Sequence, residues 1–133
     1  MNGKRILLAD DNPNDVELTL CALEELGIDG EVAVVGDGDE ALDYLRRVGK
    51  FSNRPTANPV VTLLDMKMPK VSGLEVLRQM KSDATLRTIP VVMLTSSREQ
   101  QDVNDSYAAG VNAYVVKPVE FEKFVKAVKE IGN

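Results

Sequence analysis

The chain contains no histidine, and Cys21 is its only cysteine. One cysteine cannot form an internal disulfide, and without histidine the chain cannot build a Ser-His-Asp or Cys-His nucleophile or the usual zinc site. It cannot carry phosphohistidine either. No apolar run approaches the roughly 20 residues that cross a bilayer, and the short apolar stretch near the start is no signal peptide. We therefore expect a cytoplasmic protein without a membrane partner.

The remaining composition is that of one globular domain. The 133 residues are 44% hydrophobic and 28% charged, which predicts a soluble chain with a core of its own. The net charge of −5 argues against binding of nucleic acid, because gripping a phosphate backbone needs a basic face. No repeat or linker divides the sequence. We expect a single domain over residues 1–133.

Five short apolar runs alternate with helical patterns along this domain. Most of the runs are continuously apolar, which is typical of parallel strands covered on both faces. Alternation of strands and helices five times over predicts a doubly wound α/β fold with a parallel sheet and right-handed crossovers. The predicted strands are Arg5–Ala9, Glu31–Val35, Val60–Leu64, Ile89–Leu94 and Ala113–Val116.

The segments between these strands carry helix signals. Asn12 and Pro13 are a good cap and first residue for a helix that stops at Gly27. Asp37 followed by Glu40 resembles a capping box. The other predicted helices cover about Gly73–Lys81, about Arg98–Ala109 before Gly110, and the end of the chain. Three groups of apolar positions supply the inward faces of the first, second and last of these helices: Val16, Leu20 and Leu23; Ala41, Tyr44, Leu45 and Val48; and Phe121, Phe124, Val125 and Val128.

Residues 49–59 form a longer connection, GKFSNRPTANP, that is rich in Pro, Asn and Ser. Such a composition between a helix and a strand predicts a surface loop inserted into the domain.

Polar side chains gather where the predicted strands end. Asp10 and Asp11 end the first strand, and Asp65 ends the third. Thr95 ends the fourth strand and Lys117 the fifth. Ligands in such folds bind outside the carboxyl ends of the strands, so these five residues are expected to share one site. Each alone would be an ordinary cap, strand-end hydroxyl or surface lysine, but together they favour a functional site.

Clustered carboxylates suit a hard cation such as Mg2+, which takes one or two carboxylates and a phosphate oxygen. The charges of Asp10, Asp11 and Asp65 are balanced by Lys117 and one divalent cation. An acyl phosphate on Asp65 would replace one negative charge with roughly two. The cation and the ammonium would hold that extra charge, as is usual in phosphoryl transfer.

Four segments, ILLADDNPND, LLDMKMPKVSG, VVMLTSS and AGVNAYVVKPVEFEKF, resemble the receiver domains of two-component response regulators. This CheY-like resemblance covers nearly the whole chain in the right order. It implies a flavodoxin-like, five-stranded parallel sheet of order 2-1-3-4-5 with five helices. It also implies a stand-alone regulator, and the motifs look most like small regulators paired with phytochrome-type or other sensor kinases.

The same resemblance implies residue roles. Asp65 would accept a phosphoryl group from a histidine kinase, and Asp10, Asp11 and Asp65, with the backbone carbonyl of Lys67, would form the magnesium site. Thr95 would hydrogen-bond the phosphoryl oxygen, and Lys117 would pair with it. A cis bond before the next residue, Pro118, is expected on the same grounds.

A switch follows from these roles. Closure of the loop after the fourth strand around Thr95 would let Tyr114 rotate inward, a two-state change driven by local charge. The face made by the fourth helix, fifth strand and fifth helix would then change shape, and it is the expected contact with a partner or a second copy. We also expect Lys67 to alter the hydrolysis rate of the acyl phosphate.

Two other interpretations remain open. The order Asp65-Met66-Lys67 is superficially similar to the Asp-x-Asp of phosphatases that form an aspartyl phosphate, but Lys67 replaces the second aspartate. A receiver that is never phosphorylated is the other rival. The run Gly36–Ala41 also matches G-x-G-x-x-A, yet its acidic residues would repel a pyrophosphate, so we interpret it as a helix-capping turn. As a receiver without a separate substrate, the protein would not be an enzyme.

Overall fold

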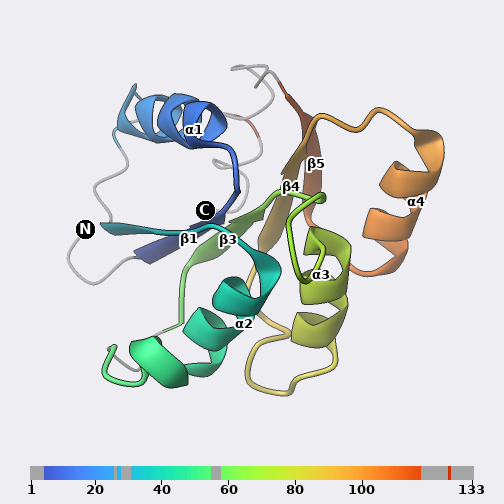
Figure 1. Cartoon of the computed structure of the whole chain (residues 1–133). Helices are drawn as coiled ribbons and strands as arrows, with labels where there is room; N and C mark the ends of the chain where they lie inside the picture. The colour runs from blue at the N-terminus through green and yellow to red at the C-terminus, as the bar shows by residue number, and fades with distance from the viewer. Residues whose placement is uncertain (1–4, 26, 28–30, 55–57, 118–125, 127–133) are drawn as a thin grey trace.

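The computed structural model describes residues 5–25, 27, 31–54, 58–117 and 126. Its centre is a parallel five-stranded sheet of order β2-β1-β3-β4-β5, as predicted (Figure 1). The reversal of order at β1 and β3 creates the switch point at which such sheets bind ligands. The strands are β1 (Arg5–Ala9), β2 (Glu31–Val35), β3 (Val61–Leu64), β4 (Val91–Thr95) and β5 (Ala113–Val116).

Three strand boundaries differ from the prediction. β3 begins one residue late, at Val61, and Val60 is exposed. β4 begins at Val91 because the amide of Ile89 donates to Leu86 O inside the preceding turn. Its last residue is Thr95, one later than expected. The polar end of β4 therefore lies within the strand ladder.

Helices and strands alternate as predicted. The described α-helices are α1 (Pro13–Glu25), α2 (Gly38–Arg46), α3 (Gly73–Lys81) and α4 (Gln100–Ala108). Asn12 Oδ1 accepts from the amides of Asn14 and Asp15, which confirms the predicted cap of α1. The fifth expected helix, with the phenylalanine and valine positions assigned to it, lies outside the described residues.

Two expectations about the helices are wrong in detail. Val48 does not continue the inward face of α2, because Arg47 adopts a left-handed conformation with φ 58° and ends the helix. Val48 is consequently exposed. α4 begins at Gln100, two residues later than predicted, after an extended Glu99.

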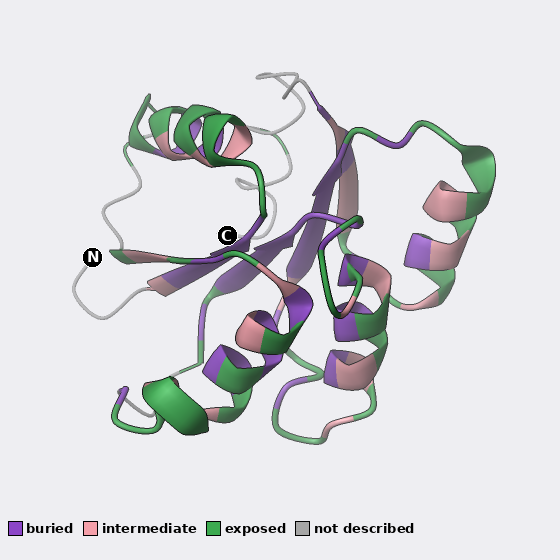
Figure 2. Cartoon of the chain, viewed as in Figure 1, coloured by how far each residue is buried: buried purple, intermediate pink, exposed green. Residues whose placement is uncertain are grey.

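Buried apolar side chains form a layer on each face of the sheet. α1 contributes Ala22 and Leu23 to one layer, whereas residues of α2 and α3, such as Leu42 and Val76, enter the other. The strands β1, β3 and β4 are almost entirely buried, whereas the edge strands β2 and β5 are only partly buried, and the outer faces of the helices are exposed (Figure 2). Within the described part of the chain, no helix has the length and apolar character needed to cross a membrane.

The connection over residues 49–59 is exposed at most of its described residues, which are 49–54, 58 and 59. It begins with a 3-10 helix, η1 (Gly49–Phe51). Arg54 is buried, with 9% of its surface exposed, and its guanidinium donates to the carbonyls of Tyr44 and Leu45 at 2.6 and 3.2 Å. Arg54 thereby satisfies carbonyl groups near the end of α2. The buried Arg54 side chain therefore anchors the connection to α2.

Candidate functional site

Strand register places two aspartates at the same edge of the sheet. Ala9 of β1 pairs with Leu64 of β3, so Asp10 and Asp65 each follow directly after paired residues. The backbone ladder continues past them, because the Asp65 amide donates to Ala9 O at 2.9 Å and the Asp10 amide donates to Val35 O at 3.0 Å. Neighbouring strands therefore hold both carboxylates at the switch point.

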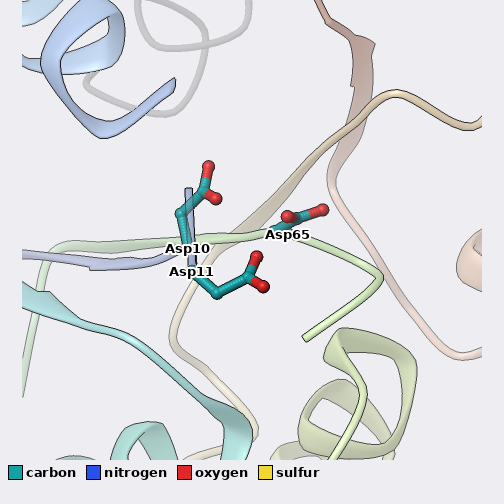
Figure 3. A group of neighbouring side chains, drawn as sticks. All are labelled: Asp10, Asp11 and Asp65. Atoms are coloured by element: carbon teal, nitrogen blue, oxygen red, sulfur yellow. The ribbon is translucent and has the colours of Figure 1, made fainter. Parts of the chain in front are cut away.

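Asp11 completes an acidic cluster with these two residues. One carboxylate oxygen from each of Asp10, Asp11 and Asp65 lies within 4.8 Å of the others. Figure 3 shows the three side chains next to one another beyond the ends of β1 and β3. Asp10 and Asp65 are buried, whereas Asp11 is exposed. The cluster thus has a buried floor and an open side.

Lys117 lies among carboxylates, as predicted, but one of its three partners is outside the predicted set. Its ammonium donates to Asp10 Oδ2 at 2.6 Å and to Asp65 Oδ2 at 3.3 Å. It also donates to Asp15 Oδ2 at 3.0 Å. The sequence did not single out Asp15, since an acidic residue in the first turn of a helix is ordinary. Only the tertiary structure brings α1 to Lys117.

The charged groups perturb one another. Burial raises the pKa of Asp65 from 3.8 to about 6, against the opposing influence of the Lys117 charge. Burial alone would lower the pKa of Lys117, but hydrogen bonds to Asp10 and Asp15, together with the Asp65 charge, raise its pKa overall. The ammonium is therefore retained, while Asp65 loses its proton at a higher pH than an ordinary aspartate does.

The site suits a hard divalent cation. Three convergent carboxylates are the oxygen donors that such cations prefer, and one oxygen from each lies within 4.8 Å of the others. The sequence predicted that the charges of the site sum to zero when a divalent cation is bound. That sum is wrong by one negative charge, because Asp15 adds a fourth carboxylate. With Lys117 and a divalent cation the site keeps one net negative charge.

The segment after β3 shapes the backbone of Asp65. The Gly73 amide donates to Met66 O at 2.8 Å, and a Cβ on Gly73 would lie only 2.1 Å from Asp65 O. The start of α3 therefore lies so close to the end of β3 that position 73 has room only for glycine, which has no Cβ. Lys67 has an exposed side chain, and its amide donates to Asp65 Oδ1 at 3.4 Å.

Thr95 and Tyr114 are joined through the loop after β4. The fully buried Thr95 accepts a hydrogen bond from the Ser97 amide at 3.2 Å. The Tyr114 hydroxyl donates to Ser97 O at 2.9 Å, and its half-buried ring packs against the core. Among the described residues, the side-chain hydrogen bond found for Thr95 leads to Ser97, not to Asp65. Ser97 is thus a linking residue that the sequence analysis did not identify.

The glycine pair before α2 has a structural role. Asp37 Oδ1 accepts from the Glu40 amide at 2.7 Å and caps α2. A Cβ on Gly38 would lie 1.9 Å from Val71 O, so this glycine permits α2 to approach the loop after β3. These contacts support the interpretation of this segment as a helix-capping turn and not as a dinucleotide-binding site.

Comparison with known proteins agrees with this geometry. Residues 6–129 match the model of the response regulator receiver domain family. The chain is 42% identical over 126 residues to the probable methanogenesis regulatory protein FilR2 of Methanothrix harundinacea, covering 95% of this chain and 79% of that protein. It is 38% identical over 130 residues to the response regulator Rcp1 of Synechocystis, covering 98% and 87%.

Solved structures extend the agreement. The bacteriophytochrome response regulator RtBRR is 59% identical with a TM-score of 0.89, and the match covers 98% of this chain and 78% of that one. A structure of Rcp1 is a Mn2+-bound form, 38% identical with a TM-score of 0.83, covering 96% and 91%. Sequence, fold and acidic cluster point the same way: this chain belongs to the response regulator receiver domain family.

Proposed function

We propose that this receiver acts as a stand-alone response regulator whose phosphoacceptor is Asp65. The observation that carries the proposal is the placement of the Asp65 carboxylate beside the Lys117 ammonium and two further strand-end acids. A carboxylate in this setting has a cation on one side and a site for a second cation on the other. That arrangement suits the arrival of a phosphoryl group.

The reaction is a transfer between two side chains. An oxygen of Asp65 attacks the phosphorus of a phosphohistidine on the kinase. The new O–P bond gives an acyl phosphate as the N–P bond breaks, and the kinase imidazole leaves with that electron pair. Lys117 holds positive charge beside the incoming oxygens, and Thr95 supplies a hydroxyl from the neighbouring strand. Hydrolysis later returns Asp65 to a carboxylate.

Mg2+ would be held by Asp10, Asp11 and Asp65, with the Lys67 carbonyl as the further protein ligand. When bound, such a cation neutralises charge on the phosphoryl oxygens. The chain's own contribution is to fix the carboxylates through β1 and β3. We also propose that the Lys67 ammonium alters access of water to the acyl phosphate, so Lys67→Ala should change its hydrolysis rate.

The signal would pass through Ser97. Movement of Thr95 toward a phosphoryl oxygen would shift the Ser97 backbone, whose carbonyl accepts from Tyr114. α4, β5 and the segment after β5 would change shape together, and this face is the proposed contact with a target or a second copy. The histidine kinase, by analogy with the relatives named for phytochrome signalling, would be of the phytochrome type. Since such a kinase draws on ATP, we place the protein in the cytoplasm.

Two rivals are separated from this proposal by one experiment. The protein is incubated with acetyl phosphate and Mg2+, and its intact mass and released phosphate are followed over time. We expect the mass of one phosphoryl group, slow release, and no gain in Asp65→Asn, with Asp39→Asn as the matched control. A phosphatase would turn over many donor molecules. A receiver that is never phosphorylated would gain no mass, which would refute the proposal.

A further inference from the structure

The Lys117 ammonium has its three N–H donors matched by three carboxylates. An ammonium group has three donors and no acceptor, and Asp10, Asp15 and Asp65 all lie within 3.3 Å of its nitrogen. Asp10 and Asp65 belong to the cluster already described, whereas Asp15 comes from α1. An incoming phosphoryl oxygen must therefore compete for a donor that already has a partner.

Asp15 is held in position by its own helix. Its amide donates to the cap residue Asn12 at 3.2 Å, and the buried Thr19 hydroxyl donates to Asp15 O at 2.9 Å. The Asp15 side chain is 30% exposed, compared with 7% for Lys117. The carboxylate therefore sits at the rim of the site on an anchored backbone, and it reaches a buried ammonium.

The charge of Asp15 acts against a phosphoryl group in two ways. It engages one hydrogen of the ammonium that would otherwise turn to the phosphoryl oxygens. It also leaves the cation-filled site with a net negative charge, to which an acyl phosphate adds about one more. Both contributions favour the form of Asp65 that carries no phosphoryl group.

We infer that Asp15 is a positioning residue that retains Lys117 in its resting arrangement and thereby shortens the lifetime of the phosphorylated form. This inference rests on the proposed function of Asp65. It assigns to α1 a part in setting how long the signal persists, in addition to its role in covering the sheet.

The test uses the full chain with Mg2+ and beryllofluoride, which stands in for the phosphoryl group. The dissociation constant is measured by NMR titration, and the decay of the acyl phosphate by mass spectrometry. For Asp15→Asn we expect roughly three- to tenfold tighter beryllofluoride binding and a longer acyl phosphate lifetime by a similar factor, since one charge a few ångströms away is removed at the protein surface. The gain should shrink as salt is added.

Two variants control for other effects. Asp15→Glu keeps the charge and should stay near wild type. Glu17→Gln removes a charge from an exposed position of the same helix and should also stay near wild type. A merely structural role of Asp15 would weaken binding, so tighter binding is diagnostic.

Failure of this inference and failure of the proposed function would give different experimental results. If wild type binds beryllofluoride and gains a phosphoryl group, but Asp15→Asn matches Glu17→Gln or binds more weakly, this inference is wrong and the proposed function stands. If wild type itself neither binds beryllofluoride nor becomes phosphorylated, the proposed function fails and the inference falls with it.

Discussion

The Lys117 ammonium lies 2.6 Å from Oδ2 of Asp10, and the two side chains are 7% and 1% exposed. They come from opposite ends of the described chain, so this contact ties β5 to β1 across the carboxyl edge of the sheet. A buried charge of this kind contributes little net stability while paired, but removing its partner is costly. The Asp10–Lys117 ion pair therefore belongs to the functional site and also contributes to holding the fold together.

Lys117→Met should destabilise the protein by about 3 kcal/mol at neutral pH, because buried carboxylates then lose their cation. Chemical denaturation would measure this change, with Lys50→Met, at an exposed lysine, as the control. Added Mg2+ should restore part of the loss, since a cation can replace the missing charge. Equal stability of the two variants would contradict a structural role for Lys117.

The stability of the cation-free protein should fall as pH rises from about 4 to about 6. Burial raises the pKa of Asp65 from 3.8 to about 6, so the folded chain binds this proton more tightly than the unfolded chain does. Above the folded pKa the proton is lost and its contribution to stability with it. The decrease is at most about 3 kcal/mol.

Other acids titrate in the same range, so the measurement is a difference between wild type and Asp65→Asn. Urea unfolding in the presence of a chelator is followed at a series of pH values. Asp65→Asn should lack this decrease and become relatively more stable at neutral pH. Parallel curves for the two proteins would show that Asp65 ionises normally.

Gly73→Ala should disturb both the fold and the site. The new Cβ would lie 2.1 Å from Asp65 O, so either the start of α3 or the end of β3 must move. We expect a loss of roughly 1–3 kcal/mol, the cost of overpacking, and slower phosphorylation by acetyl phosphate. Gly36→Ala is the control, because a Cβ there has no neighbour within 4 Å, and it should change stability by less than about 0.5 kcal/mol.

Arg54→Met should loosen the connection between α2 and β3. The variant loses hydrogen bonds to Tyr44 O and Leu45 O and the stacking of the guanidinium on the Tyr44 ring, 4.5 Å from its centroid. We expect a stability loss of about 2–4 kcal/mol and faster hydrogen exchange over residues 49–54. Arg98→Met, at an exposed arginine, should show neither effect.

Tyr114→Phe should weaken the link between β5 and the loop after β4. It removes the hydrogen bond to Ser97 O and keeps the ring. The expected stability loss is about 1 kcal/mol, while the response of the α4 amides to beryllofluoride, seen by NMR, should diminish. An unchanged response would separate Tyr114 from the proposed switch.

Much of this protein could be predicted from its sequence alone. Continuous apolar runs separated by capped helical patterns determine a parallel α/β sheet, because both faces of such strands must be buried. The residues that end the strands, Asp10, Asp65 and Lys117, then meet at one edge as a geometric consequence of parallel order. For this reason the acidic cluster and its lysine were predictable, and the family resemblance added the strand order.

Other features were decided only in three dimensions. Asp15 joins Lys117 because α1 packs back over the sheet, and nothing in its local sequence distinguishes it from an ordinary helix-start acid. Arg54 is buried because a connection folds against α2, although its composition indicates an exposed loop. Local patterns record which residues prefer helix, strand or burial, whereas contacts between distant segments depend on how the assembled layers pack.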